Sequence, residues 1–216
     1  PLGIIITEKN VITVCTRGNP VLDEFTDGAV KGVQTNLKTR FILHLMLRIA
    51  TKYLQYLKQI DKLSSHVERE LRKSMKNSEL IQLLDIEKSL VYFSSSLKGS
   101  EITIEKISRG RVVKLYEEDQ DLLEDVLIEV RQAIEMSSIY LNILSGTMDA
   151  FASVISNNLN IVMKVLASIT LIISIPTVIS SFYGMNVEGL PLPFFWFPLL
   201  LAIVSMGIAY LILRKK

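Results

Sequence analysis

The sequence predicts a mainly α-helical membrane protein, in which a long stalk helix continues into the first of two C-terminal transmembrane helices. The stretches 165–182 and 190–213 carry no charged residue over 18 and 24 residues, and a helix needs about 20 apolar residues to cross a bilayer core. A helical pattern leads into the first stretch from residue 117 without a long break. A β-branched N-terminal segment indicates the remnant of an α/β cytoplasmic domain.

The composition argues against several functions. The chain has 216 residues, a net charge of +2 and 21% charged residues, which gives no reason to expect nucleic acid binding. Cys15 is the single cysteine, and His44 and His66 are isolated and expected to be ordinary helix-surface residues. The chain shows no nucleophile–base set, phosphate loop or paired histidines, so we expect no enzymatic activity.

The first residues predict a β-hairpin. The β-branched segments 4–7 and 11–16 flank the polar turn Glu8-Lys9-Asn10. Two strands alone are marginally stable in water. We therefore expect them to belong to a larger sheet whose other strands lie upstream of this chain, or to pair with a partner chain.

Helices are expected to follow Pro20. Apolar residues recur at helical spacing from Lys38 to about Lys73. Ser78 is the expected N-cap of a helix over 80–97, and Lys98-Gly99-Ser100 are expected to end it. Residues 101–116 are interpreted as a connector.

The predicted long helix runs from Glu117 to Tyr183. Its 67 residues would extend for about 100 Å. Pro176 is tolerable within a membrane because nearby hydroxyls, such as those of Thr177 and Ser180, can bond the carbonyl that it frees.

The expected domain organisation has five parts. They are a partial cytoplasmic domain (1–116), a cytoplasmic stalk helix (117–161), a first transmembrane helix (162–186), an external loop (187–193), and a second transmembrane helix with a basic tail (194–216).

Basic residues predict the orientation of the two spans. Lys164 precedes the first span and 214–216 follow the second, whereas the loop between them carries only the acid Glu188. The positive-inside rule then places both termini in the cytoplasm. The aromatic residues 194–197 would anchor the outer interface.

A polar stripe follows the long helix at alternating spacings of four and three, the repeat of a helix packed in a bundle. Its members are Asp149, Ser153, Ser156, Asn160, Met163, Ala167, Thr170, Ser174, Thr177 and Ser181.

Such a stripe either lets helices approach closely or lines water. The oxygens that continue it at both ends, up to Asn186 and down to Asn160 and Asp149, favour water. Met163 lies at the cytoplasmic membrane edge, where an apolar constriction could gate a pore, and Leu166 could join it. Two spans cannot enclose a pore, so several copies would have to surround an axis.

Gly184-Met185-Asn186 stands between the two spans. With this tripeptide in that place, the segments 157–164, 175–177 and 114–119 make the chain resemble the CorA family of divalent-cation channels. The tripeptide's position between two C-terminal spans makes the resemblance specific.

The resemblance implies a homopentamer in a cell membrane, with a funnel-shaped cytoplasmic domain and a pore lined by the first span. It implies a selectivity ring at Asn186, pore positions at Thr177, Ser174, Asn160 and Asp149, and a gate at Met163 and Leu166. It also implies a regulatory Mg²⁺ carboxylate at Asp125, whose partner acid would lie in an N-terminal portion that this chain is expected to lack.

The loop departs from the family pattern. Where family members often carry Met-Pro-Glu, this chain has Leu190-Pro191-Leu192-Pro193, so only Glu188 would concentrate cations there. Mg²⁺, both transported and regulatory, is the expected ion, and no organic cofactor is expected. The alternatives are transport of Zn²⁺, Co²⁺ or Ni²⁺, or a two-span membrane scaffold without transport.

Overall fold

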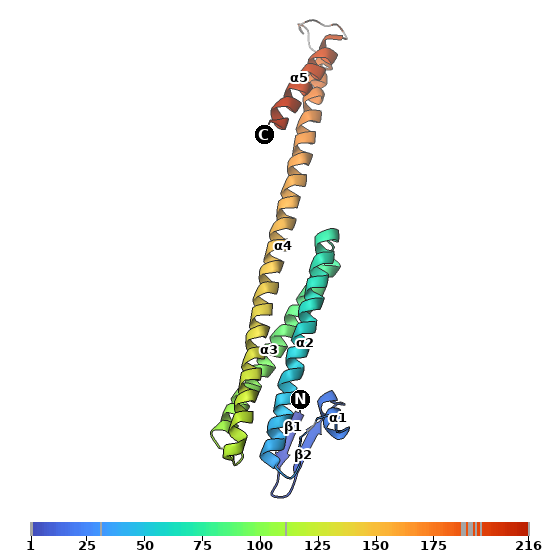
Figure 1. Ribbon diagram of the computed structural model, residues 1–216. Coiled ribbons are helices and arrows are strands. Elements are labelled where there is room, and N and C mark those ends of the chain that lie inside the picture. Colours follow the sequence, from blue (N-terminus) through green and yellow to red (C-terminus); the bar gives the residue numbers. More distant parts are fainter. Residues whose placement is uncertain are drawn as a thin grey trace. The chain divides into compact units, whose positions relative to one another are not determined.

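The computed structural model describes residues 2–30, 32–110, 112–186, 189, 192, 194 and 196–215. The chain divides into two compact units, Pro1–Asp149 and Ala150–Lys216. The first unit contains the strands and most of the helices, and the second contains the end of helix α4 together with α5 (Figure 1).

The first unit begins with the predicted hairpin. Strand β1 (Leu2–Ile6) pairs antiparallel with β2 (Val11–Cys15), with Leu2 opposite Cys15 and Ile6 opposite Val11. The backbone N–H of Thr7 donates to the carbonyl of Asn10 at 2.8 Å and closes the turn. Alternate residues of β2 are half-buried and exposed, as expected for a sheet with one covered face.

Helix α1 (Pro20–Thr26) is short, and ion pairs connect it to α2. Asn19 caps it, accepting a hydrogen bond from the N–H of Val21 at 3.0 Å. Glu24 pairs with Arg48 and, at 2.7 Å, with Lys52, both on α2. Hydrogen bonds from Arg48 and then Lys52 hold the pKa of Glu24 below its ordinary value of 4.5.

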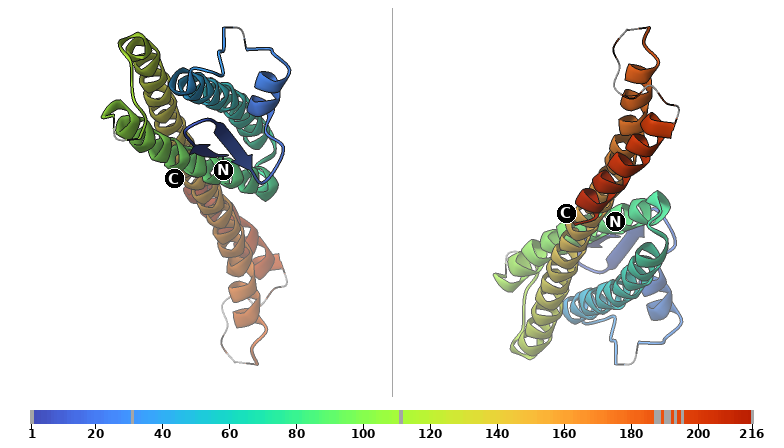
Figure 2. Two further views of the ribbon diagram at one scale, coloured as in Figure 1. Left: turned by 90° about the horizontal axis from the view of Figure 1, so that it is seen from below. Right: turned by 90° about the horizontal axis from the view of Figure 1, so that it is seen from above.

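Three long helices form the core of the first unit: α2 (Lys38–Ser74), α3 (Asn77–Ser108) and the lower part of α4 (Gln120–Tyr183). A short 3-10 turn (Glu117–Asp119) leads into α4. Figure 2 shows the ribbons of α2, α3 and α4 from two further sides. The residues buried in the cluster that the three helices share are Leu43, Ala50, Ile104, Ile107, Leu123, Val126 and Val130. Ser137 of α4 is also fully buried, and its hydroxyl donates to the Leu90 carbonyl of α3 at 3.2 Å.

Two sequence predictions for α3 are wrong. The helix begins at Asn77 with Lys76 as the N-cap, and the hydroxyl of Ser78 donates instead to the neighbouring Glu79 carboxylate at 2.8 Å. The helix also continues through Gly99 and ends at Ser108, so residues 101–108 are not a connector.

Burial explains why α3 does not stop at Gly99. Leu97, Ile104 and Ile107 are spaced by seven and three residues, lie on one face and are all buried. An interior glycine costs a helix about 1 kcal/mol, whereas burying a leucine or isoleucine side chain stabilises by about 1.5–3 kcal/mol. The chain turns instead near Gly110, which has a φ of +66°.

The second unit contains two helices that are long and apolar enough to cross a bilayer, and neither apolar window is buried. They are the upper part of α4, which ends at Tyr183, and α5 (Trp196–Arg214). The ring centroids of Tyr183 and Phe197 lie 6.2 Å apart, so the end of α4 meets the start of α5.

Burial identifies the faces by which these two helices pack. On α4 the half-buried positions recur at helical spacing: Ser168, Ile172, Ile175, Pro176, Ile179 and Tyr183. On α5 the buried or half-buried positions do the same: Phe197, Pro198, Ala202, Ser205, Met206, Ala209 and Leu213. The two spans therefore form an antiparallel pair.

Candidate functional site

The predicted polar stripe is exposed throughout. Every stripe position from Asp149 to Ser181 is exposed. Successive helical residues differ by about 100° around the axis, so Ser174 lies about 200° from Ile172, which faces α5. The stripe thus occupies the side of α4 opposite α5, and α5 leaves it open.

Three of the stripe hydroxyls donate their hydrogens to carbonyls of the same helix. Thr170 Oγ1 donates to the carbonyl of Leu166 at 2.9 Å, Ser174 Oγ to that of Leu171 at 2.9 Å, and Thr177 Oγ1 to that of Ile173 at 3.1 Å. Each hydroxyl keeps its oxygen lone pairs as acceptors. The exposed side of the stripe therefore presents neutral oxygen acceptors, which suit water molecules and hard cations.

Thr177 does not take the role expected of it beside Pro176. A proline frees the carbonyl four residues earlier, which here belongs to Ile172. The Thr177 hydroxyl instead bonds the neighbouring carbonyl, that of Ile173. Of the two candidates, Thr177 and Ser180, Thr177 does not bond the freed carbonyl, because its hydroxyl makes the usual bond to the residue four positions before it.

Gly184 ends α4 through a close backbone approach. Its N–H donates to the carbonyl of Ser180 at 2.9 Å, and Met185 N–H donates to that of Phe182 at 3.3 Å. A Cβ at position 184 would lie 3.2 Å from the Ser180 carbonyl oxygen, which is tighter than nearly all such contacts. This steric reason for glycine depends on the backbone path at the end of α4 and could not be predicted from the residues alone.

Asn186 lies two residues after Gly184 and is exposed. It stands three residues after the last residue of α4, so the chain brings an amide to the end of the span that carries the stripe. Glu188, the predicted cation-attracting acid, lies outside the described residues, as do most positions of the predicted loop.

The two predicted gate residues are both exposed. Met163 and Leu166 are each 55% exposed, on the same helix as the stripe and ahead of Thr170. Asn160 and Asp149 are also exposed, further toward the start of α4. At that exposure, neither Met163 nor Leu166 is a core residue of the single chain.

Asp125 is exposed on the first turns of α4. Within the part of the chain that the structure describes, no three His, Cys, Asp or Glu side chains are grouped so as to hold a metal ion. Asp125 would therefore need ligands from outside the described residues to form a metal site.

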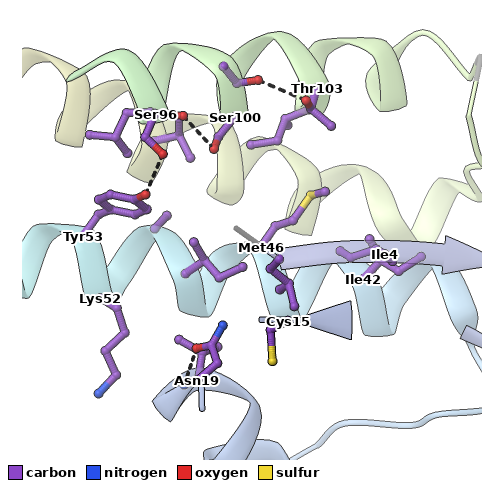
Figure 3. Close-up of a pocket in the computed structure, with 18 of the residues that line it drawn as sticks. Ile4, Cys15, Asn19, Ile42, Met46, Lys52, Tyr53, Ser96, Ser100 and Thr103 are labelled. Atoms are coloured by element: carbon purple, nitrogen blue, oxygen red, sulfur yellow. Dashed lines mark hydrogen bonds between the residues drawn. The ribbon is translucent and has the colours of Figure 1, made fainter. Parts of the chain in front are cut away.

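The first unit also contains a cavity of about 1010 Å³ between the hairpin, α2 and α3 (Figure 3). Four hydroxyls along it have partners: Tyr53 with Ser96 at 2.8 Å, Ser100 with the Ser96 carbonyl at 3.0 Å, and Thr103 with the Gly99 carbonyl at 3.0 Å. Lys52 is paired with Glu24. The cavity therefore presents a mainly apolar wall, which the free Cys15 thiol also lines.

The chain is similar to known proteins over most of its length. The family model described as "CorA-like Mg2+ transporter protein" matches residues 1–215. The "Cobalt/magnesium transport protein CorA" of Methanocaldococcus jannaschii is 28% identical over 179 residues, which is 81% of this chain and 56% of that protein. The protein of the same name from Thermotoga maritima is 25% identical over 210 residues, 95% of this chain and 60% of that protein.

Solved structures support the fold. "The complete structure of CorA magnesium transporter from Methanocaldococcus jannaschii" matches with a TM-score of 0.81 at 23% identity, covering 98% of this chain and 68% of that one. The soluble domain of the same transporter matches with a TM-score of 0.62 at 22% identity, covering 68% of this chain and 61% of that one. The chain thus spans 56–60% of the length of the curated relatives. Because the family model covers nearly the whole sequence, the chain belongs to the CorA-like Mg²⁺ transporter family.

Proposed function

We propose that this chain forms an oligomeric divalent-cation channel that mediates Mg²⁺ uptake across the cytoplasmic membrane and is gated by intracellular Mg²⁺. One observation carries the proposal: the polar stripe of α4 is exposed on the side opposite α5. A scaffold helix pair has no use for hydroxyls in register on a surface that would otherwise face lipid, because polar groups are costly there.

Assembly around an axis would give the stripe its aqueous surroundings. In a cyclic homo-oligomer, and we propose a pentamer, each stripe residue becomes a ring. The α4 helices would face the axis and α5 would face lipid, which fits the apolar composition of α5. Both termini would lie in the cytoplasm.

The proposed ion chemistry relies on neutral oxygens. Mg²⁺ gives up its water reluctantly and prefers octahedral oxygen coordination. A ring of Asn186 amides, next to Gly184 and Met185, would recognise the hydrated ion, and the hydroxyls of Thr170, Ser174, Thr177 and Ser181 would solvate it along the stripe. Asn160 and Asp149 would continue the path into the cytoplasm.

Gating is proposed at Met163 and Leu166, whose apolar rings could dewet the pore. Asp125 is the proposed regulatory carboxylate, in partnership with an acid from outside the described residues. Glu188 would attract cations to the mouth.

The curated relatives are named as cobalt/magnesium transport proteins. Co²⁺ is therefore the first alternative ion, ahead of Zn²⁺ and Ni²⁺. The non-transporting scaffold is the alternative from a different functional class.

The test is ion uptake into proteoliposomes with a panel of Mg²⁺, Co²⁺, Ni²⁺ and Zn²⁺, using the full-length protein and an Asn186→Ala variant of the same oligomeric state. Mg²⁺ uptake that depends on Asn186 is expected. Uptake of only the other ions would reassign the cargo. A correctly inserted oligomer that takes up no ion would favour the scaffold.

A further inference from the structure

Basic residues in the second unit gather at one end of the helix pair. Between residues 150 and 216 the basic residues are Lys164, Arg214, Lys215 and Lys216, and the one acid is Glu188. Lys164 directly precedes the uncharged part of α4, and Arg214 ends α5. The described members Lys164, Arg214 and Lys215 are all exposed.

The antiparallel packing brings these residues to the same level. The Tyr183–Phe197 contact joins the opposite ends of the two helices. From there α4 runs 19 residues back to Lys164 and α5 runs 17 residues on to Arg214, which is about 28 Å and about 26 Å at helical rise. Both distances are close to the roughly 30 Å thickness of a bilayer core.

Lys164 lies off the polar stripe. It follows Met163 and is therefore about 100° around the helix from it. It precedes by one turn Ser168, which is half-buried on the side that packs against α5. Its charge is thus directed toward the α5 side of the pair rather than along the stripe.

Apolar surface adjoins the basic residues. Val165 and Ile169 follow Lys164 on α4, and Leu211 and Ile212 precede Arg214 on α5; all are close to half exposed or more. A ligand that fits this surface has an anionic head and a hydrocarbon tail. A soluble anion would contact only the basic residues of this surface.

We propose that Lys164, Arg214 and Lys215 bind the phosphate groups of anionic phospholipids in the cytoplasmic leaflet, with the acyl chains lying against the adjoining residues of α4 and α5. This inference rests on the proposed orientation of the two spans, but it does not need the chain to conduct ions. Cytoplasmic-leaflet lipids attract basic residues next to transmembrane helices.

Native mass spectrometry of the purified full-length protein, titrated with dioleoyl-phosphatidylglycerol or dioleoyl-phosphatidylcholine, tests the proposal. The triple variant K164Q/R214Q/K215Q should bind phosphatidylglycerol roughly a hundredfold more weakly, at about fivefold for each charge, with phosphatidylcholine binding unchanged. The variant K88Q/K98Q/K106Q removes three exposed lysines from α3 and should bind like the wild type. The variant K164R/R214K/K215R keeps the charges and should retain binding, which separates loss of charge from misfolding.

Two results would overturn the proposal. One is an unchanged preference for phosphatidylglycerol in the triple glutamine variant. The other is displacement of the lipid by millimolar inorganic phosphate, which would indicate a site for a soluble anion. Asn186→Ala should lose uptake but keep lipid binding, so failure of the proposed channel function and failure of lipid binding are distinguishable.

Discussion

Tyr183 and Phe197 hold their ring centroids 6.2 Å apart, with the ring planes inclined at 58°. The contact joins the last residue of α4 to the second residue of α5. It shows that the two helices meet at these ends and run antiparallel. The half-buried residues of α4 before Tyr183 show which face of α4 packs against α5. The polar stripe is left on the opposite face, and this arrangement leads to the predictions below.

Asn186→Ala should abolish Mg²⁺ uptake while leaving the oligomer intact, because the change removes the amide oxygen proposed to recognise the hydrated ion. Uptake into liposomes and the oligomeric state by size-exclusion chromatography are the measurements. Wild-type flux through a correctly assembled Asn186→Ala protein would contradict the selectivity assignment.

Met163→Ala should make the channel leaky. The change shortens an exposed apolar side chain at the proposed constriction, so water and ions should pass more readily. Uptake is measured at high internal Mg²⁺, where the wild type is expected to be closed. If closure is unchanged, the constriction lies elsewhere, and Leu166→Ala is the next variant to measure.

Local patterns were enough to predict most of the fold. The hairpin, the start of α2 at Lys38, and the run of α4 to Tyr183 agree with the expectations from β-branching and helical periodicity. The predicted end of α3 was wrong because Gly99 is a local stop signal, whereas buried residues on both sides of Gly99 stabilise the helix. Periodicity describes one helix and does not include the neighbours that stabilise it.

Some features of the candidate site were predicted from the sequence and others were not. The spacing identified the stripe, and the structure finds those positions exposed. Which face of α4 packs against α5 could not be predicted, because hydroxyl and apolar side chains occur on both faces. The hydroxyl of Ser168 is on the face toward α5, whereas the apolar Ala167 is not. The close approach of Gly184 to the Ser180 carbonyl also depends on the path of the backbone at the end of α4. The roles of Asn186, Met163 and Asp125 stay predictions until the assembled protein is measured.

Leu43→Ala should destabilise the first unit by about 2–5 kcal/mol, the usual range for removing a fully buried leucine. Leu43 is 0% exposed where α2, α3 and α4 meet. Leu63 on the same helix is 51% exposed, and Leu63→Ala should change stability by about 0.5 kcal/mol or less. Thermal unfolding followed by circular dichroism compares the two, and equal losses would contradict the assigned core.

Acid should loosen the attachment of α1 to α2. The pKa of Glu24 is lowered in the folded state by hydrogen bonds from Arg48 and Lys52. The stabilisation that the Glu24 carboxylate gives the folded state is therefore complete above the ordinary carboxyl pKa of 4.5. It is lost as the pH falls through the lower pKa that Glu24 has in the folded state. The stability difference between wild type and Glu24→Gln, measured as melting temperature, should shrink over that acid range. A constant difference would show that the carboxylate charge is unimportant.

The stripe itself gives the most direct test of a pore. Single cysteines at Thr170, Ser174, Thr177 and Ser181 should react with a membrane-impermeant thiol reagent in the assembled protein, with Cys15 replaced, because thiols need water to ionise and react. Cysteines at Ile172 and Ile179 should not react, because both positions are half-buried on the side facing α5. Labelling should therefore rise and fall with the four-three spacing along α4. If Ile172 and Ile179 react as readily as Ser174, or if labelling follows no helical period, the stripe is a packing surface. Hydroxyls that donate to carbonyls of the same helix, as Thr170 does to Leu166, would then serve close helix contact, and the scaffold would be the better account of the protein.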